Sequence, residues 1–336
     1  MTAAGATILG CAGPVLGAEE RAFFRAADPW GFILFARNVE TPAQLRRLTG
    51  ALREAVGREA PVFVDQEGGR VARLGPPHWR AWAPPFDQIA RAGEGAARSM
   101  WLRYRIIAAE LRAAGIDGNC APTCDIAGEA THPFLRNRCY GSDPETVAMA
   151  ARAVAEALLA GGVLPVLKHM PGHGRATVDS HAELPQVDRP RAELLAWDCA
   201  PFRALADLPL AMTAHVVYRA LDLGLPATLS RACIRTIREE IGFSGLLMSD
   251  DISMQALAGP LGARASAAIA AGCDVVLHCK GARTEMEEVV AAAGRLSPLA
   301  AARAEVALAR RSAPGPIDIP ALEAELEALL AGPVNG

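Results

Sequence analysis

Short apolar segments alternate along the chain with longer stretches in which apolar residues recur at helical spacing. The short segments are rich in valine, isoleucine and leucine, which is typical of strands buried on both faces. Eight such strands are predicted, at residues 6–11, 31–36, 61–65, 116–122, 163–169, 210–216, 245–250 and 273–279. Helical patterns separate them, among them 42–56, 100–115 and 144–162. Because strands that alternate with helices run parallel, the pattern predicts an α/β fold, a single closed (β/α)8 barrel of the TIM type.

An open, doubly wound sheet is the structural alternative to the barrel. No G-x-G-x-x-G motif follows an early strand, so a dinucleotide-binding fold loses its main support. After the last predicted strand, the sequence SAPGPIDIP (312–320) breaks the helical pattern. One amphipathic helix, ALEAELEALLA, follows it. We therefore expect residues 1–311 to form the barrel. Residues 312–336 are expected to form a short C-terminal helical tail that is not a separate domain.

The composition of the chain excludes some classes of protein and of binding partner. The 336 residues are 51% hydrophobic and carry a net charge of −3, which excludes a disordered chain and disfavours a nucleic-acid partner. No apolar run approaches the roughly 18 residues of a membrane helix, and the first residues are not typical of a secretory signal. The eight cysteines lie mostly in apolar runs, as reduced core thiols do. We expect a cytoplasmic monomer with no membrane partner.

Lysine is almost absent. Of the 34 basic residues, all but Lys168 and Lys280 are arginine. A chain that uses arginine so widely retains lysine where a compact ammonium fits and a broad guanidinium does not. We expect such a reason for Lys168, whereas chance retention is the better explanation for Lys280.

Polar residues follow the predicted strands at their carboxyl ends, where barrels of this kind carry their chemistry. Such residues occur after seven of the eight strands: Arg37 and Asn38, residues 65–70, Asp125, Lys168 and His169, His215, Asp250 and Asp251, and residues 278–280. Because all strands are parallel, these side chains are expected to gather at one rim, where a ligand binds.

The segment KHMPGHGRATVDSH (168–181) is the most specific of these. His169, His173 and His181 could ligate a metal, but their spacing fits no common zinc motif and the adjacent lysine would repel a cation, so no metal site is expected. In the pair Asp179-x-His181, a carboxylate can orient and charge an imidazole for proton transfer near neutral pH. For His173, packing or a loop hydrogen bond remains an open alternative.

Two further segments carry carboxylates. In MSDDISM, a carboxylate at a strand end can act as a nucleophile at an electrophilic carbon. Since side chains alternate along a strand, only one of Asp250 and Asp251 is expected to face the pocket, while the other caps a helix or makes a structural bond. In DQEGGRVARL (65–74), a carboxylate and a guanidinium suit sugar hydroxyls, although a turn with an internal arginine–carboxylate pair is the alternative.

DQEGGRVARL, NRCYGSDP, KHMPGHG with DSH, MTAHVVY and MSDDISM occur in the order that characterises glycoside hydrolase family 3. Over residues 31 to about 280 the chain resembles the single-domain, NagZ-type β-N-acetylglucosaminidases of that family. The resemblance implies that Asp250 is the nucleophile and that His181 is the acid/base, supported by Asp179. It further implies the sugar-binding residues Asp65, Arg73, Arg138, Lys168 and His169. Neither a cofactor nor a metal is implied.

The chain departs from the family pattern at three places. Met170 stands where phenylalanine is usual, Arg175-Ala176 where Asp-Thr is common, and Cys139-Tyr140 where Ser-Phe or Ser-Tyr is usual. These positions could alter the order of the loop or the aglycone side of the site. Every residue to which the resemblance assigns a role is nevertheless present.

The resemblance implies a retaining exo-glycosidase, a β-N-acetylhexosaminidase, that releases terminal β-linked N-acetylglucosamine. The expected substrate is a small amino-sugar muropeptide, N-acetylglucosaminyl-1,6-anhydro-N-acetylmuramic acid with or without its peptide, from peptidoglycan recycling. A phosphorylase that uses the same covalent intermediate and a hydrolase assisted by the substrate acetamide are alternatives. A sugar-binding barrel without enzymatic activity is the alternative from a different class.

Overall fold

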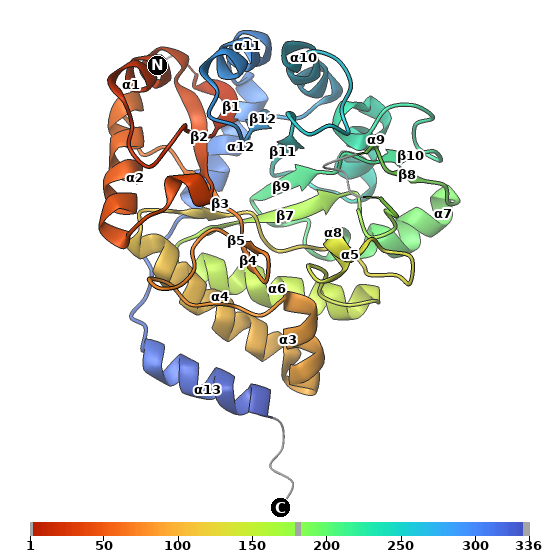
Figure 1. The fold of residues 1–336 in the computed structure, drawn as a ribbon. Coiled ribbons are helices and arrows are strands. Elements are labelled where there is room, and N and C mark those ends of the chain that lie inside the picture. The colour runs from red at the N-terminus through yellow and green to blue at the C-terminus, as the bar shows by residue number, and fades with distance from the viewer. Residues whose placement is uncertain (1–2, 179–182, 332–336) are drawn as a thin grey trace, which may run out of the picture.

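A closed eight-stranded barrel forms the centre of the computed structural model, which describes residues 3–178 and 183–331 (Figure 1). Neighbouring strands of the barrel are all parallel. In the order in which they pair, they are β1 (Gly5–Leu9), β12 (Val275–His278), β11 (Leu246–Asp251), β9 (Leu210–Thr213), β7 (Leu164–Met170), β6 (Gly118–Asn119), β3 (Val62–Val64) and β2 (Pro29–Leu34). Each lies at a predicted strand, so the predicted barrel is confirmed.

The fourth strand is shorter than its sequence pattern predicts. Residues 116–122 were expected to be extended, but only Gly118–Asn119 pair as β6. The backbone N–H of Cys120 still bonds the carbonyl of Val64 at 2.9 Å, and Pro122 follows without an N–H to donate. Gly118 is required here because a Cβ at this position would stand 2.2 Å from the ring of Phe63. The regular strand therefore ends early, although residues 121–124 continue to bond β7 through the N–H groups of Val166 and Lys168 and the carbonyl of Lys168.

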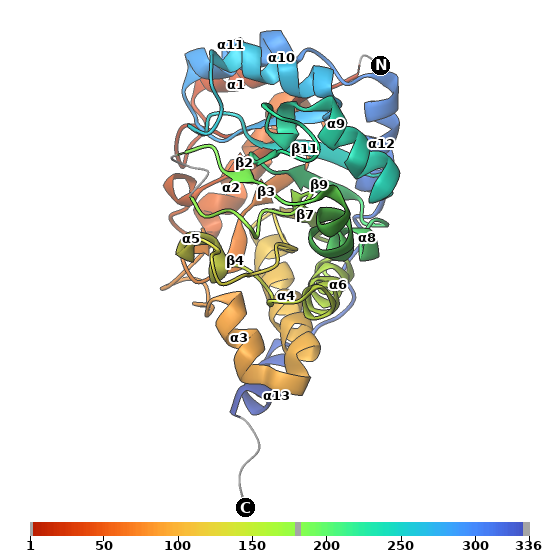
Figure 2. The ribbon, with the colours of Figure 1, turned by 90° about the vertical axis from the view of Figure 1, so that its right-hand side faces the viewer.

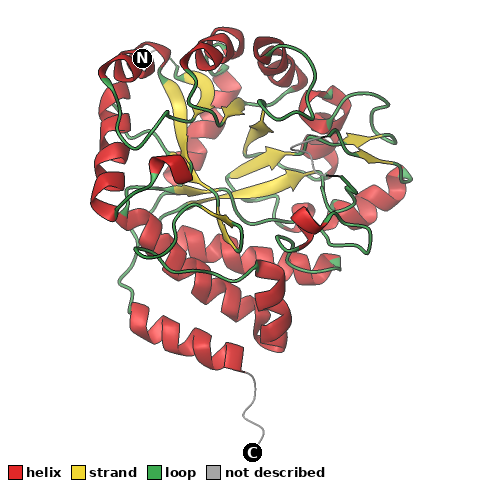
Figure 3. Ribbon diagram, viewed as in Figure 1, coloured by secondary structure: helices red, strands yellow, loops and turns green. Residues whose placement is uncertain are grey.

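Helices surround the barrel on its outside (Figure 3). Their bounds are α1 (Ala18–Ala27), α2 (Pro42–Val56), α3 (Pro85–Ala92), α4 (Ala96–Ala113), α5 (Pro133–Arg136), α6 (Pro144–Ala160), α7 (Arg191–Glu193), α8 (Ala200–Ala204), α9 (Arg231–Arg235), α10 (Leu261–Ala271), α11 (Arg283–Ala293), α12 (Pro298–Ala309) and α13 (Ile319–Ala331). Short 3-10 or π segments are η1 (Ala36–Asn38), η2 (Gly93–Gly95), η3 (Leu194–Asp198), η4 (Ala227–Leu229) and η5 (Thr236–Glu240). No helix of the described residues is both long and apolar enough to span a membrane.

The predicted helix starts follow from their capping residues. Helix α2 begins after Thr41, whose side chain accepts the N–H of Gln44, and it ends at Gly57 with a φ of 65°. Helix α6 begins after Asp143, which accepts the N–H of Thr146. In both helices a proline occupies the first turn, where its missing N–H costs no helical hydrogen bond.

The C-terminal helix α13 lies against α3 and α4 on the outside of the barrel (Figures 1 and 2). Leu326 on α13 is buried in this contact. Arg98 of α4 forms two hydrogen bonds with the carboxylate of Glu325, at 2.7 and 2.8 Å. The predicted tail helix thus lies on the ring of helices that surrounds the barrel.

Two small sheets lie beyond the barrel. One is formed by β4 (Gln66–Gly68) and β5 (Val71–Ala72), directly after β3. The other pairs β8 (Gln186–Val187) with β10 (Val217–Tyr218), which follow β7 and β9. Because all four segments follow carboxyl ends of barrel strands, they build up the rim at which the polar residues were predicted to gather.

Candidate active site

A cavity of about 210 Å³ opens at the carboxyl ends of the barrel strands. Its polar lining residues are Asp65, Arg73, His132, Arg138, Lys168, His169, His173, Asp250 and Asp251. Apolar side chains, among them Phe35, Phe134 and Met254, complete the wall. All predicted site residues within the described part of the chain therefore border one cavity.

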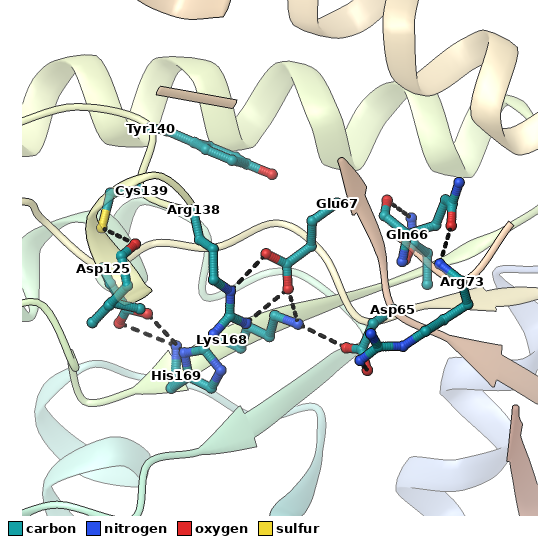
Figure 4. A network of polar contacts seen from close by, with 12 residues as sticks. Asp65, Gln66, Glu67, Arg73, Asp125, Arg138, Cys139, Tyr140, Lys168 and His169 are labelled. Atoms are coloured by element: carbon teal, nitrogen blue, oxygen red, sulfur yellow. Dashed lines mark hydrogen bonds and ion pairs between the residues drawn. The ribbon is translucent and has the colours of Figure 1, made fainter. Parts of the chain in front are cut away.

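Five charged side chains form a continuous network of contacts (Figure 4), and four of them, all but Glu67, line this cavity. Arg73 Nη2 lies 3.1 Å from Asp65 Oδ2, and the other oxygen of Asp65 lies 3.0 Å from Lys168 Nζ. Lys168 Nζ also contacts Glu67 Oε1 at 2.5 Å. The carboxylate of Glu67 then accepts two hydrogen bonds from Arg138, at 2.9 and 2.8 Å. Positive and negative groups alternate from Arg73 to Arg138, and each carboxylate bridges two cations.

These groups keep their charges although they are buried. Burial raises the pKa of Asp65, but Lys168 and Arg73 lower it further, to well below its usual range. For Glu67, Arg138 and Lys168 likewise outweigh burial and hold the pKa at about 2. Burial lowers the pKa of Lys168, yet Glu67 and Asp65 raise it above its ordinary value. The cavity therefore presents the ammonium of Lys168 and the carboxylate of Asp65 in their charged forms near neutral pH, a pair that can donate to and accept from sugar hydroxyls.

Glu67 was missing from the predicted site residues. It is fully buried, and it holds both Arg138 and Lys168. The signal was present in the sequence, since Glu67 stands two residues after Asp65 and therefore on the same side of an extended chain. Two N–H groups of Arg138, predicted to contact sugar, are thus engaged by Glu67.

His169 is oriented by Asp125, a second residue outside the predicted set. The ring Nδ1 lies 2.7 Å from Asp125 Oδ2, and the same carboxylate accepts the backbone N–H of His173 at 2.7 Å. Burial raises the pKa of Asp125, but the contacts with His169 and His173 together outweigh burial and hold the pKa at about 2. Because the carboxylate is ionised, we assign the Nδ1 hydrogen to the bond with Asp125, which leaves Nε2 as the ring's other polar atom.

Asp250 and Asp251 both border the cavity, so strict alternation along β11 does not remove Asp251 from it. The pairing of β11 with β12 shifts register between Met248 and Asp251, which explains the departure from alternation. The carboxylate of Asp251 accepts hydrogen bonds from the backbone N–H and hydroxyl of Ser253 and from the backbone N–H of Cys279. Asp251 thus makes the structural bonds predicted for one of the two aspartates.

The strand end that carries Asp250 is held from two sides. The backbone N–H of Asp251 donates to Asp250 Oδ1 at 2.7 Å. His215 Nε2 donates to the carbonyl of Asp251 at 2.9 Å, while its Nδ1 lies 2.8 Å from the hydroxyl of Thr228. Burial lowers the pKa of His215, in accord with a neutral ring that donates through Nε2. These bonds fix the position of the carboxylate of Asp250 at the cavity.

Asp179 and His181 lie outside the described residues, so the predicted acid/base pair has no structural account here. The part of the loop that precedes them is anchored. Arg175 Nε lies 2.9 Å from both carboxylate oxygens of Asp198, and Arg175 Nη2 lies 2.8 Å from Glu193. A Cβ on Gly174 would stand 1.9 Å from the carbonyl oxygen of Ile126, so the loop backbone packs closely there. Arg175, a departure from the family pattern, therefore fastens the loop to η3.

The other two departures lie in the core. Met170 is fully buried at the end of β7. Cys139 is also fully buried, and its thiol contacts the carbonyl of Leu135 at 3.4 Å. Neither of these two residues is among those that line the cavity.

An eight-stranded barrel whose carboxyl ends enclose a small cavity rich in buried carboxylates defines a barrel enzyme, and comparison with known proteins identifies its class. The profile of the glycosyl hydrolase family 3 N-terminal domain matches residues 18–311, and the chain belongs to this family. The β-hexosaminidase of Alkalilimnicola ehrlichii is 41% identical over 286 residues, which cover 82% of this chain and 80% of that protein. The β-hexosaminidase of Pseudomonas aeruginosa PAO1 is 38% identical, covering 87% of each chain.

A solved structure agrees. NagZ from Neisseria gonorrhoeae, in complex with N-trifluoroacetyl-D-glucosamine, superimposes with a TM-score of 0.83 at 30% identity and covers 98% of this chain and 97% of that chain. The protein is thus a glycoside hydrolase, and more particularly a β-N-acetylhexosaminidase.

Proposed function

We propose that this enzyme releases terminal β-linked N-acetylglucosamine with retention of configuration, through a covalent intermediate on Asp250. The observation that carries the proposal is the position of Asp250 in the same small cavity as the charged chain from Arg73 to Arg138. The charged side chains from Arg73 to Arg138 hold the hydroxyl groups of the sugar. The strand end of β11 directs the carboxylate of Asp250 at the anomeric carbon. The N-acylated glucosamine bound in the gonococcal relative supports an N-acetylated sugar here.

The reaction follows in two steps. Asp250 attacks the anomeric carbon while protonated His181 gives its proton to the leaving oxygen, which releases the aglycone and forms a glycosyl ester. Neutral His181 then accepts a proton from water as the water attacks the anomeric carbon, and the ester bond to Asp250 breaks. Asp179 supports the charged form of His181. The roles of His181 and Asp179 rest on the sequence motif, which replaces the usual second carboxylate by a histidine.

The size of the cavity supports an exo-acting enzyme. About 210 Å³ lies below the 300–1,000 Å³ typical of sites for drug-sized ligands, so a single sugar ring suits it better than a disaccharide. The aglycone would then lie at the mouth of the cavity. We infer that the natural substrate is N-acetylglucosaminyl-1,6-anhydro-N-acetylmuramic acid, with or without its peptide, a small molecule from peptidoglycan recycling.

Trapping the intermediate tests the mechanism. A fluorinated N-acetylglucosaminide slows the second step, and mass spectrometry of the digested protein should place the added sugar on the peptide that contains Asp250. A label on another residue would contradict the role of Asp250. The absence of any label, in an active enzyme whose rate depends on the acetamide of the substrate, would favour the substrate-assisted route. Adding phosphate during turnover decides the phosphorylase alternative, because a phosphorylase would give N-acetylglucosamine 1-phosphate.

The substrate itself is tested by comparing kcat/KM for the anhydromuramyl disaccharide and for chitobiose. Both carry the same terminal sugar, so a preference for the first shows recognition of the muramyl aglycone. Equal values would leave the glycosidase activity intact and contradict the assignment to peptidoglycan recycling.

We further propose that the enzyme acts in the cytoplasm as a monomer. All eight cysteines lie in the described part of the chain as free thiols, and seven of them are buried, which suits a reducing compartment. Light scattering after size-exclusion chromatography should give a mass near 35.2 kDa. A mass near twice that value would refute the monomer.

A further inference from the structure

His173 is a buried cavity residue that the reaction described above does not use. It lies in the loop after β7, is 6% exposed and lines the same cavity as Asp250. Neither ring nitrogen has a hydrogen-bond partner within the described residues. Buried polar groups are nearly always hydrogen-bonded, so a ring that leaves both nitrogens unpaired at a binding cavity calls for an explanation.

The backbone, and not the ring, holds His173 in place. Its N–H donates to Asp125 Oδ1 at 2.7 Å, and its carbonyl accepts the N–H of Ala176 at 3.0 Å. The N–H of Gly172, one residue earlier, donates to the carbonyl of His169 at 2.8 Å. The imidazole is thus held without a hydrogen bond of its own to any described residue.

Asp125 fixes two rings together at the wall of the cavity. Its carboxylate binds the side chain of His169 and the backbone of His173, and the two ring centroids lie 5.6 Å apart. His173 therefore occupies the part of the cavity next to a predicted sugar-binding residue. This position favours a contact with the terminal sugar over a contact with the aglycone.

The ring is neutral near pH 7. Burial lowers the pKa of His173 to about 4, and the opposing effect of Asp125 is smaller. A neutral imidazole offers one N–H donor and one nitrogen acceptor, a pair that matches a hydroxyl or an acetamide. A ring that stays unprotonated at neutral pH is also a poor general acid, so proton donation to the leaving group does not account for it.

We propose that His173 is a sugar-binding residue, whose imidazole hydrogen-bonds a polar substituent of the terminal N-acetylhexosamine. The inference rests on the proposed function, since it assumes that this cavity holds that sugar. It adds a neutral donor and acceptor pair to the charged chain on the cavity base. A purely structural position would gain from an apolar ring, because two unpaired nitrogens in a buried site destabilise the folded protein.

Three substitutions test this proposal with N-acetylglucosamine as the probe in isothermal titration calorimetry. His173→Phe keeps a ring and removes both nitrogens. His173→Asn and His173→Gln place an amide near the former Nδ1 and Nε2, respectively. One lost neutral hydrogen bond is worth about 2- to 10-fold in affinity, so we expect Kd to rise by that factor or more in His173→Phe. One of the two amide variants should recover most of the loss, and thermal unfolding of free His173→Phe should occur at or above the wild-type Tm.

His278 provides a matched control. Its ring is also buried, and neither nitrogen has a hydrogen-bond partner within the described residues, although Nε2 lies 3.5 Å from Glu285 Oε2; His278 is not among the residues that line the cavity. His278→Phe should leave the Kd for N-acetylglucosamine unchanged.

The outcomes separate the possible failures. An unchanged Kd in His173→Phe, or a loss shared by His278→Phe, overturns the role of His173 while the enzyme remains a glycosidase. A lower Tm of free His173→Phe with unchanged affinity assigns the ring a structural role. If the wild-type enzyme neither binds N-acetylglucosamine nor cleaves its β-glycosides, the proposed function fails, whatever the variants do. If His173→Phe loses unequal amounts of activity on N-acetylglucosaminides and on glucosides, the acetamide is the partner of the ring. Equal losses of activity would point to a hydroxyl group.

Discussion

Lys168→Arg preserves charge, yet the structure predicts severe damage to catalysis. The side chain of Lys168 is 2% exposed, and its single nitrogen is shared between Asp65 at 3.0 Å and Glu67 at 2.5 Å. A planar guanidinium is wider than an ammonium and cannot point one nitrogen between two carboxylates in the same volume. Overpacking a buried site costs about 1–3 kcal/mol, and a shift of about 1 Å at a reacting centre can cost about 10²-fold in rate.

Lys280→Arg is the control within the same chain. The side chain of Lys280 is 57% exposed, and its ammonium lies 3.9 Å from Glu285 in a weak surface contact. Substitutions at such positions usually change stability by no more than about 0.5 kcal/mol. We expect kcat/KM on a chromogenic N-acetylglucosaminide to fall about 100-fold for Lys168→Arg and less than about 2-fold for Lys280→Arg. Near-equal values would show that the cavity base tolerates a guanidinium and that lysine survives at residue 168 by accident.

Three further outcomes are expected. Asp250→Ala should abolish turnover, whereas Asp251→Ala should keep much more activity. Asp251→Ala should also unfold at lower temperature, because Ser253 loses its hydrogen-bond partner. The reverse order of activities would contradict the assignment of the nucleophile. His181→Ala should lose less activity on substrates with acidic leaving groups, which depart without protonation; equal losses across leaving groups measured in kcat/KM would argue against proton transfer. The pKa of Glu67 is lowered from 4.5 to about 2, so its ionised form contributes stability that is fully present above pH 4.5 and lost as pH falls through about 2. Urea unfolding between pH 2.5 and 6 should therefore show a shallower pH dependence for Glu67→Gln, and an unchanged slope would refute the charge assignment.

The architecture was predictable because the periodicities were consistent along the chain. Parallel strands in a barrel must lie between helices, so alternation of strand and helix patterns leaves few other folds. The ends of individual helices and strands could be predicted less exactly, because local contacts decide them. Helix α4 begins at Ala96, directly after η2, whereas the apolar periodicity predicted its start at residue 100. Likewise, the regular strand β6 ends at Asn119, shortly before Pro122, which has no N–H to donate, although residues 121–124 still bond β7.

The position of the site was predictable, and its internal pairing was not. Strand ends of a barrel meet at one rim, which is why Asp65, Lys168 and Asp250 could be expected to share a cavity. Which cation each carboxylate takes depends on side-chain geometry across the barrel. Glu67 pairs with Arg138, 71 positions later, and Asp125 with His169, 44 positions later. No local pattern specifies such partners, although the spacing of Glu67 from Asp65 indicates the same side of the chain. Neither carboxylate was among the predicted site residues.

Glu67 changes how the cavity can stabilise its reaction. The transition state of glycoside cleavage resembles an oxocarbenium ion and carries positive charge on the sugar ring. Without Glu67, three cations on the cavity base would face only Asp65, and their field would oppose that charge. With Glu67 in place, each cation already has an anionic partner. The five charged side chains then carry a net charge near +1 and present oriented hydrogen bonds. We infer that Glu67 serves the reaction mainly by limiting the positive field around Asp250, while the sugar is held by the groups that Glu67 positions.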